Sequence, residues 1–314
     1  MRKLSYHIDA YKAEHESGLL DLEHSTPQGK GVKLEMVRPE FLSRSKIFDR
    51  YDVFVALNQN RTEIIGVSAV SIVPLMIENI ITDVGFGYDL KVAPPYQNRG
   101  IAKEFAKHLI DVYLADNGIS EYFTTFKSSN ETMTSVVHFI SREWQAYNFI
   151  YLTVPTFKRV KYSNLALSDQ LLSIEMLGNS EKLKKYIIET ENGIKIWKTY
   201  STYQLKIQDM TCFLNMGIKS INSFKSKTKK IPVTGDVLKF ATLYHFNKSN
   251  IGSVNEALDV LQKRNIQYLN ICCTKDDFVY KLFNPIAISR MPYSLLNTFG
   301  VTNGQRLSLD VRCL

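Results

Sequence analysis

The stretch from Val84 to Asn117 constrains the fold of this chain more than any other. Alternating apolar residues predict a strand over Val84–Val92, and one face of that strand is expected to carry Phe86, Tyr88, Leu90 and Val92. The proline pair at 94–95 ends the strand, because proline cannot donate to a β-ladder. Apolar residues at helical spacing then predict a helix from Ile101, which Gly118 terminates. The segment therefore predicts a strand, a short loop and a helix.

The loop before this helix has the composition of an anion site. Small residues at Gly100 and Ala102 remove side chains that would hold an anion away from the main chain. Backbone N–H groups at a helix N-terminus, aided by the helix dipole, then favour a phosphate. A charge-assisted contact from Arg99 is expected at the rim. The predicted phosphate loop comprises Gln97, Asn98, Arg99, Gly100, Ile101 and Ala102. An ordinary strand-to-helix turn with a capping glycine is the alternative.

The pattern Q-x-x-G-x-A at 97–102, after a strand that ends in L-x-V-x-P, resembles motif A of the GNAT acyl-CoA-dependent N-acetyltransferases. In that family this loop binds the pyrophosphate of coenzyme A. The glycine spacing of Walker and dinucleotide loops is absent. The chain layout, with an early P-x-G-K at 27–30, is also similar to the HOOKLESS-type acetyltransferases of plants. That similarity is strong over residues 50–155 and weak beyond residue 235.

The resemblance implies that acetyl-CoA is the co-substrate and that no metal is needed. In the family, the strands matching Val84–Val92 and Glu121–Lys127 splay apart, and the pantetheine arm enters the gap like an added strand. Leu90, Lys91 and Val92 match the backbone positions that hold this arm. The amide of Val92 is the catalytic candidate for polarising the thioester carbonyl, because an oxyanion needs a preorganised donor.

A helix with a buried side of Val136, Val137, Phe139 and Ile140 is predicted to begin after Asn130. Asn130 matches an asparagine that commonly contacts the coenzyme, and the favoured alternative is that it acts only as an N-cap. Many family members place a tyrosine on this helix to protonate the leaving thiolate, whereas the nearest aromatic residue here is Phe139. His138, Tyr147 or water are the candidate replacements. A missing acid costs about 10²-fold, which slows transfer without preventing it.

The general base is the least determined role. Asp89 is the catalytic candidate, with a solvated strand carboxylate as its alternative. Strict alternation places Asp89 with Asp83 on one face and Tyr88 with Leu90 on the other. No metal-ligand pattern is formed by the six histidines, which are His7, His15, His24, His108, His138 and His245. The four cysteines show neither metal-ligand spacing nor a disulfide framework.

The order of predicted elements indicates the fold class. A strand at 5–11, helices at 14–24 and 32–48 and a hairpin over 52–73 precede the central strand. The resulting order β-α-α-β-β-β-α-β-α-β matches an α+β GNAT fold with a central, mostly antiparallel, splayed sheet flanked by helices. Pro155 marks a boundary between a GNAT domain at 1–155 and a second α+β domain at 156–314.

The second domain repeats part of the first. Strand, helix, strand and helix are predicted between Val237 and Phe283, without a second Q-x-x-G-x-A. The expectation is a GNAT-like domain without a coenzyme site, and the alternative is an unrelated α+β cap. Residues 1–160 hold 18 Lys and Arg against 19 Asp and Glu, and residues 161–314 hold 21 against 12. The net charges are therefore −1 and +9.

The basic half suggests an acidic partner. Lys219–Lys230 contains five lysines, which predict either a solvated loop or a contact with nucleic acid. The longest apolar stretch, Val67–Ile77, is too short to span a bilayer, so we expect no membrane association and an intracellular, cytoplasmic protein, or a nuclear one in a eukaryote.

The predicted function is transfer of an acetyl group from acetyl-CoA to a primary amine by direct attack in a ternary complex. A protein lysine near nucleic acid is the acceptor that the charge split favours. Two other classes remain open: an acyl-CoA-binding protein that has lost transfer, and a nucleic-acid or chromatin adaptor that uses the basic domain.

Overall fold

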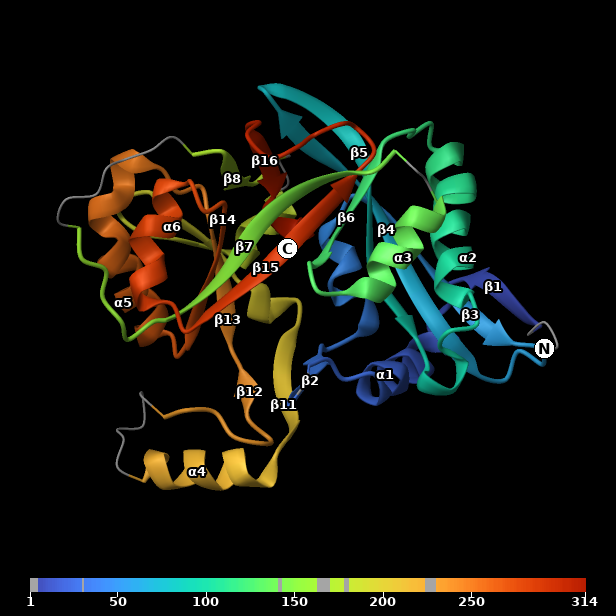
Figure 1. Ribbon diagram of the computed structural model, residues 1–314, viewed down its shortest axis with the longest axis horizontal. Coiled ribbons are helices and arrows are strands. Elements are labelled where there is room, and N and C mark those ends of the chain that lie inside the picture. The colour runs from blue at the N-terminus through green and yellow to red at the C-terminus, as the bar shows by residue number, and fades with distance from the viewer. Residues whose placement is uncertain (1–4, 30, 141–142, 163–169, 178–180, 224–229) are drawn as a thin grey trace. The chain divides into compact units, whose positions relative to one another are not determined.

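The computed structural model describes residues 5–29, 31–140, 143–162, 170–177, 181–223 and 230–314 (Figure 1). It contains two compact units. Unit 1 comprises 1–26, 40–149 and 292–314, and unit 2 comprises 27–39 and 150–291. The expected domains, 1–155 and 156–314, differ from these units mainly in two segments, because 27–39 packs within unit 2 and 292–314 packs within unit 1.

Unit 1 is built on a mixed sheet. Its strand order is β1-β3-β4-β5-β6-β15-β7, with β16 added to β4. The strands have the bounds β1 (Tyr6–Ala10), β3 (Arg50–Asn58), β4 (Ile64–Ile77), β5 (Ile80–Val92), β6 (Tyr122–Lys127), β7 (Gln145–Pro155), β15 (Ser289–Asn297) and β16 (Leu307–Asp310). The β5–β6 pair is parallel, and the β1–β3, β3–β4, β4–β5, β6–β15 and β4–β16 pairs are antiparallel.

Helices cover both faces of this sheet. They are α1 (Glu16–Ser25), α2 (Ile101–His108) and α3 (Glu131–Ile140), with α3 beside α2 (Figure 1). Ile101 and Phe105 of α2 are buried in one cluster with Val70 and Ile72 of β4. We call this side of the sheet the α2 face, and the opposite side, covered by α1, the α1 face. Because the apolar side of α2 is buried against the sheet, the first turn of this helix is held next to β4 and β5.

Unit 2 repeats the closing order of unit 1. The segment β13 (Phe240–Tyr244), α5 (Val254–Lys263), β14 (Tyr268–Cys273) and α6 (Phe278–Phe283) follows the expected strand-helix-strand-helix order, and β13 pairs with β14 in parallel. The later part of β7 pairs with β14 on its other side. The remaining sheet strands are β10 (Lys195–Trp197) and β9 (Ile187–Glu189), which extend the sheet beyond β13, and β8 is Leu172–Glu175.

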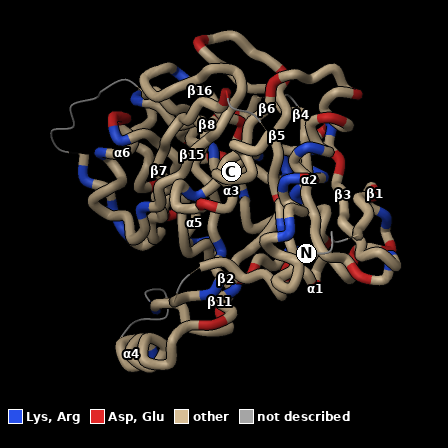
Figure 2. Tube along the Cα trace, turned by 45° about the vertical axis from the view of Figure 1, so that its right-hand side comes forward, with Lys and Arg blue, Asp and Glu red and all other residues tan. Residues whose placement is uncertain are grey.

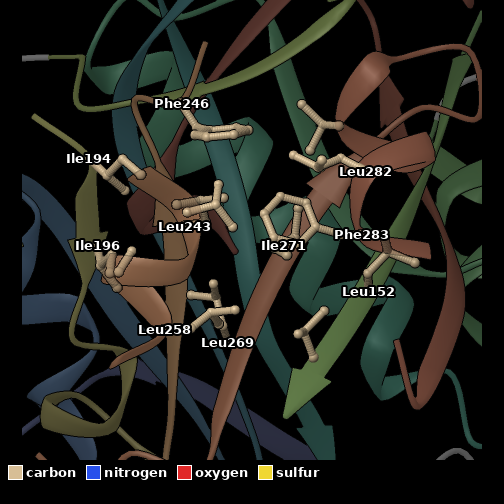
Figure 3. Packing of buried hydrophobic residues seen from close by; sticks show 14 of the residues in the cluster. Leu152, Ile194, Ile196, Leu243, Phe246, Leu258, Leu269, Ile271, Leu282 and Phe283 are labelled. Atoms are coloured by element: carbon tan, nitrogen blue, oxygen red, sulfur yellow. The ribbon is translucent and has the colours of Figure 1, made fainter. Parts of the chain in front are cut away.

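The core of unit 2 lies between this sheet and its helices. Leu243 and Ile271 point from β13 and β14 toward Phe283 and Leu282 of α6 (Figure 3). Leu258 of α5 closes the same cluster and is fully buried. Apolar strand residues that pack against the apolar sides of two helices are what the sequence pattern predicts for a sheet covered by helices.

A second, three-stranded sheet also belongs to unit 2. It has the order β12-β11-β2, formed by β12 (Val237–Leu238), β11 (Gln204–Met210) and β2 (Val32–Val37), and α4 (Cys212–Asn222) follows β11. The expected helix over 32–48 is therefore wrong. Val32, Leu34 and Met36 alternate with polar residues at the strand period, and antiparallel pairing with β11 takes this segment. Residues 41–47 form two short 3₁₀ turns, η2 (Phe41–Ser43) and η3 (Ser45–Ile47).

No helix in the described part of the chain combines the length and the apolar character that crossing a bilayer requires.

Candidate functional site

Strands β5 and β6 part from each other in the middle of unit 1. They pair only at Gly85–Gly87 with Tyr122–Thr124, although β5 continues to Val92 and β6 to Lys127. On its far side β6 stays paired with β15 along its length. The gap therefore opens along the last residues of β5, where a backbone edge is left without a neighbouring strand.

A β-bulge at Asp89 and Leu90 precedes the open edge. One residue of β4 stands opposite these two residues of β5, and the flanking register pairs are Val67 with Lys91 and Ala69 with Tyr88. Asp89 has a φ of 51°, in the left-handed region. An extra residue reverses the alternation of the side chains that follow it.

The bulge changes which residues share a face. Leu90 and Val92 pack against the α2-face cluster. Tyr88 lies opposite Ala69, and Lys91 lies opposite Val67, so both point to the α1 face. The expectation that Tyr88, Leu90 and Val92 share one face is wrong, because alternation from a sequence assumes a regular strand.

Asp89 is held by an arginine. Its Oδ1 accepts a hydrogen bond from Nη1 of Arg44 at 2.9 Å, and the two side chains are 3% and 12% exposed. The guanidinium group of Arg44 also lies 5.0 Å from the ring centre of Tyr88. Asp89 is thus a buried partner on the α1 face, and it does not share a face with Asp83, which pairs with Arg50 on the exposed surface. The alternative of a solvated carboxylate for Asp89 is also wrong.

Tyr88 completes this cluster. Its hydroxyl donates to Oγ of Ser45 at 2.9 Å and lies 2.9 Å from Oγ of Ser71. Burial raises the pKa of the Tyr88 hydroxyl above its ordinary value. Tyr88 is therefore a structural hydrogen-bonding group at neutral pH.

The loop between β5 and α2 has the expected form. Gly100 is the N-cap of α2 with a φ of 86°, and Asn98 has a φ of 61°. The carbonyl of Gly100 accepts from the amides of Lys103 and Glu104 at 3.0 and 3.1 Å, which starts the helix. A Cβ on Gly100 would meet no heavy atom within 4 Å. Gly100 therefore leaves space beside the first turn of α2, where the amides of Ile101 and Ala102 lie at the positive end of the helix dipole.

The direction of the Val92 amide follows from its neighbours. The Ala93 amide donates to the carbonyl of Ile65 on β4 at 2.9 Å. Since successive amides of a strand point to opposite sides, the Val92 N–H points away from β4, toward the gap. The carbonyl of Val92 lies on that same side and accepts from Nε2 of Gln97 at 3.0 Å. Gln97 therefore braces the end of β5 against the loop.

The side chain of Arg99 lies over the ring of Tyr96, 5.7 Å from its centre. This contact holds the guanidinium group against an aromatic ring of the loop, and the contact of Arg99 with an anion stays a prediction.

Asn130 caps α3. Its Oδ1 accepts from the amide of Met133 at 3.2 Å, and its carbonyl accepts from the amide of Thr134 at 3.1 Å. The N-cap role is thus present, and a contact with the coenzyme stays a prediction. Phe139 is 51% exposed, so its expected place on the buried side of α3 is wrong. Nζ of Lys103, on α2, lies over the Phe139 ring, 5.0 Å from its centre.

The candidate acids occupy different environments. His138 is on the exposed side of α3, and Tyr147 is fully buried with its hydroxyl 3.4 Å from the carbonyl of Gln305. Of these two side chains, only His138 is therefore accessible to solvent. The role of either group stays a prediction.

Two side chains at the site were missed by sequence reasoning. Arg44 lies in an irregular segment that offers no periodic signal. Glu23 forms a buried ion pair with Lys91. The sequence contained a signal for this residue, because Glu23 lies on the same side of the helix as Leu19 and Leu22, where a buried charge needs a partner. The side chains of Lys91 and Glu23 are 8% and 2% exposed. This pair fastens α1 to β5 immediately before Val92.

The buried pair predicts a measurable loss of stability. Replacing Lys91 by Met is expected to lower the free energy of unfolding by about 3–5 kcal/mol, because it leaves the Glu23 carboxylate buried without its cation. The double variant Lys91→Met, Glu23→Gln is expected to lose less than Lys91→Met alone. Urea denaturation checks both values, and Lys46→Met, at an exposed pair with Glu40, is the matched control. Equal stability of Lys91→Met and the control would contradict the buried-pair argument.

The remaining sequence candidates are dispersed. Within the described ranges no three His, Cys, Asp or Glu side chains are placed to hold a metal ion. Cys272, Cys273 and Cys313 are buried, and burial raises the pKa of each thiol, so these cysteines stay protonated at neutral pH. Cys212 is exposed on α4.

The lysine-rich stretch is only partly described. Lys219 lies in α4, Lys230 is exposed, and residues 224–229 lie outside the described residues, as does Lys30 of the P-x-G-K. The neighbouring β2 and β11 carry both charges, with Lys33 3.9 Å from Asp209 (Figure 2). Nucleic-acid binding stays a prediction.

The sequence of 21–137 matches the family model described as the acetyltransferase (GNAT) family. The match contains β5, the loop and α2. It also contains the second half of α1 and the first seven residues of α3. No curated protein shows a significant sequence match to the chain.

Solved structures resemble the fold of this chain over most of its length. A crystal structure of N-myristoyltransferase from Saccharomyces cerevisiae with bound myristoyl-CoA has a TM-score of 0.56 at 7% identity, and the match covers 98% of this chain and 80% of that one. A second structure of that enzyme gives 0.54 at 8% identity, with coverage of 93% and 82%. The glucosamine N-acetyltransferase region of a fungal multi-domain β-N-acetylglucosaminidase gives 0.53 at 12% identity, covering 94% of this chain and 38% of that protein. At these identities the likeness concerns the fold.

Proposed function

Because residues 21–137 match the model of the acetyltransferase (GNAT) family, we propose that this protein transfers an acetyl group from acetyl-CoA to a primary amine. The observation that carries the proposal is the coincidence, in unit 1, of the gap between β5 and β6 with the open N-terminus of α2. A thioester of a long phosphorylated carrier needs both features, a channel for its arm and an anion site for its pyrophosphate.

The residues present fit the co-substrate. The amides of 98–102 and the side chain of Arg99 would hold the pyrophosphate, since this loop offers open backbone donors and a left-handed glycine. The gap-facing backbone of Leu90 and Val92 would hold the pantetheine arm. The myristoyl-CoA in the similar yeast enzyme structures supports an acyl-CoA as the carrier. Coenzyme A supplies a thioester that is activated toward nitrogen nucleophiles.

The chain contributes polarisation and positioning. The Val92 N–H, directed at the gap, would donate a hydrogen bond to the developing oxyanion. The amine nitrogen forms a bond to the carbonyl carbon, the carbon–sulfur bond breaks, and the thiolate leaves with coenzyme A. The amine proton passes to a base or to water, and an exposed His138 has the solvent access to return a proton to the thiolate.

A protein lysine is the acceptor that we propose. The +9 charge of residues 161–314 attracts polyanions, so an acceptor carried near nucleic acid gains local concentration while a free polyamine does not. A small amine that turns over far faster than any lysine-bearing protein would contradict this choice of acceptor.

The test uses the purified full chain with acetyl-CoA and longer acyl-CoAs. We expect acetyl-CoA to raise the melting temperature, and we expect thiol release that requires an added amine from a panel of lysine peptides, nucleic-acid-bound proteins, polyamines and amino sugars. Thermal stabilisation without thiol release would indicate an acyl-CoA-binding protein that has lost transfer. Absence of any stabilisation by acyl-CoA would overturn the proposal.

A further inference from the structure

We propose that Arg44 and Asp89 form a clamp that holds the bulge of β5 and thereby aims the Leu90 and Val92 amides at the gap. Asp89 is then a positioning residue, and the proton acceptor of the reaction is another group or water. The catalytic consequence of this clamp rests on the proposed function, whereas its structural consequence does not.

The first observation is the backbone of Asp89. A non-glycine residue with a φ of 51° is uncommon, and such a conformation persists only where its surroundings impose it. Here the conformation has a defined effect, since the extra residue turns the Leu90 and Val92 side chains onto the α2 face. Without the bulge the alternation of β5 would continue from Tyr88, and the amides of the last residues would exchange sides.

The second observation is that side chains of a neighbouring segment contact Tyr88 and Asp89, where the bulge begins. Arg44 donates to the Asp89 carboxylate at 2.9 Å and lies over the Tyr88 ring, 5.0 Å from its centre. The next residue, Ser45, accepts from the Tyr88 hydroxyl at 2.9 Å. Arg44, which lies between η2 and η3, and Ser45, the first residue of η3, therefore hold two consecutive residues of β5. Burial strengthens the charge-assisted contact, because little water competes for it.

The third observation concerns what Asp89 can reach. Its side chain is 3% exposed and lies on the α1 face with Arg44. A general base must come within hydrogen-bond reach of the proton that it removes. A buried carboxylate that is hydrogen-bonded to a guanidinium group is well placed to hold the backbone and poorly placed to remove a proton from a substrate.

Hydrogen–deuterium exchange of the ligand-free full chain tests the clamp directly. In Asp89→Asn and Arg44→Gln we expect the peptide over 86–93 to exchange about tenfold faster, since a charge-assisted hydrogen bond shifts a local opening equilibrium by roughly this factor or more. The matched control is Asp83→Asn. Asp83 lies on β5, as Asp89 does, but its ion pair with Arg50 of β3 is exposed. The double variant is expected to exchange no faster than the faster single variant, because both act on one contact.

A conservative variant guards against loss of the fold. Arg44→Lys keeps the charge but loses the planar fork, so we expect an intermediate increase in exchange with a melting temperature near that of the wild type. Exchange over 86–93 that matches the control in all three single clamp variants, Asp89→Asn, Arg44→Gln and Arg44→Lys, would overturn the clamp.

Kinetics test its catalytic consequence. We expect Asp89→Asn to lower kcat by about 10- to 100-fold through misplaced amides, with the acid limb of the pH profile of kcat/KM retained. Loss of that limb, with unchanged exchange over 86–93, would overturn the proposal and make Asp89 the base. A wild-type protein without acyl-CoA binding would defeat the proposed function, while the exchange experiment, which needs no ligand, would still decide the clamp.

Discussion

Glutamate at position 100 is expected to reduce the affinity for acetyl-CoA by about 100-fold or more while unit 1 stays folded. The carboxylate would stand at the N-terminus of α2, where the pyrophosphate is proposed to bind. Two like charges about 5 Å apart at a protein surface repel by roughly 3 kcal/mol, which corresponds to about two orders of magnitude in the dissociation constant. The added side chain also covers the amides of the first turn of α2.

The fold is expected to tolerate the change. A Cβ at Gly100 meets no heavy atom within 4 Å, so the cost is confined to a left-handed φ of 86° in a residue other than glycine. That strain is about 1–2 kcal/mol and lowers the melting temperature by a few degrees. Isothermal titration with acetyl-CoA gives the affinity, and thermal unfolding gives the stability.

Gly118 provides a matched control for both the added charge and the backbone strain. Gly118 also has a positive φ, 69°, and a Cβ there would also meet nothing within 4 Å. Gly118→Glu therefore adds the same charge and a similar strain beyond the other end of the helix that starts at Ile101. Wild-type affinity in Gly118→Glu with loss in Gly100→Glu supports the loop. Equal affinities in the two variants would remove the phosphate site from this position.

A chain that ends after Phe149 is expected to fail to fold, although it contains nearly the whole domain expected from the sequence. The segment 292–314 supplies β16 and most of β15, which pair with β4 and β6. It also buries six apolar residues to 1% exposure or less, namely Leu295, Val301, Leu307, Leu309, Val311 and Cys313. At about 1.5–3 kcal/mol each, their loss totals about 9–18 kcal/mol, which is comparable with the whole stability of a domain.

Rejoining the two pieces is expected to restore the fold. The rings of Phe149 and Tyr293 lie 5.8 Å apart, so a short Gly/Ser linker can connect 1–149 directly to 292–314. Circular dichroism and thermal melting of both chains check the prediction. A cooperative transition in the chain without 292–314 would contradict it.

The central part of the fold was predictable because its signals are local. The proline pair, Gly100 and the helical spacing after Ile101 each act within a few residues, and the structure confirms a strand to Val92 and a helix from Ile101. The strand-helix-strand-helix order of unit 2 was predictable for the same reason. These elements lie in segments where periodicity and termination signals agree.

The rest depends on contacts that a local pattern does not contain. A bulge at Asp89 inserts one residue without altering the apolar count, so the alternation of β5 looked regular. The strand Val32–Val37 has its partner more than 160 residues later, in β11. Arg44 meets Asp89 across 45 positions of sequence. Tertiary pairing decided each case, and single-sequence propensity carries little of that information.

The interleaving of the two units also sets an order of completion during synthesis. Unit 2 needs residue 291 at the latest, whereas unit 1 needs 292–314. Between residues 150 and 291 a ribosome adds 142 residues, which takes roughly 7–28 s at ordinary elongation rates. Throughout that interval β6 exposes the edge that β15 later covers, an edge of the kind that chaperones shield. The unit with which the chain begins is therefore the last to be finished.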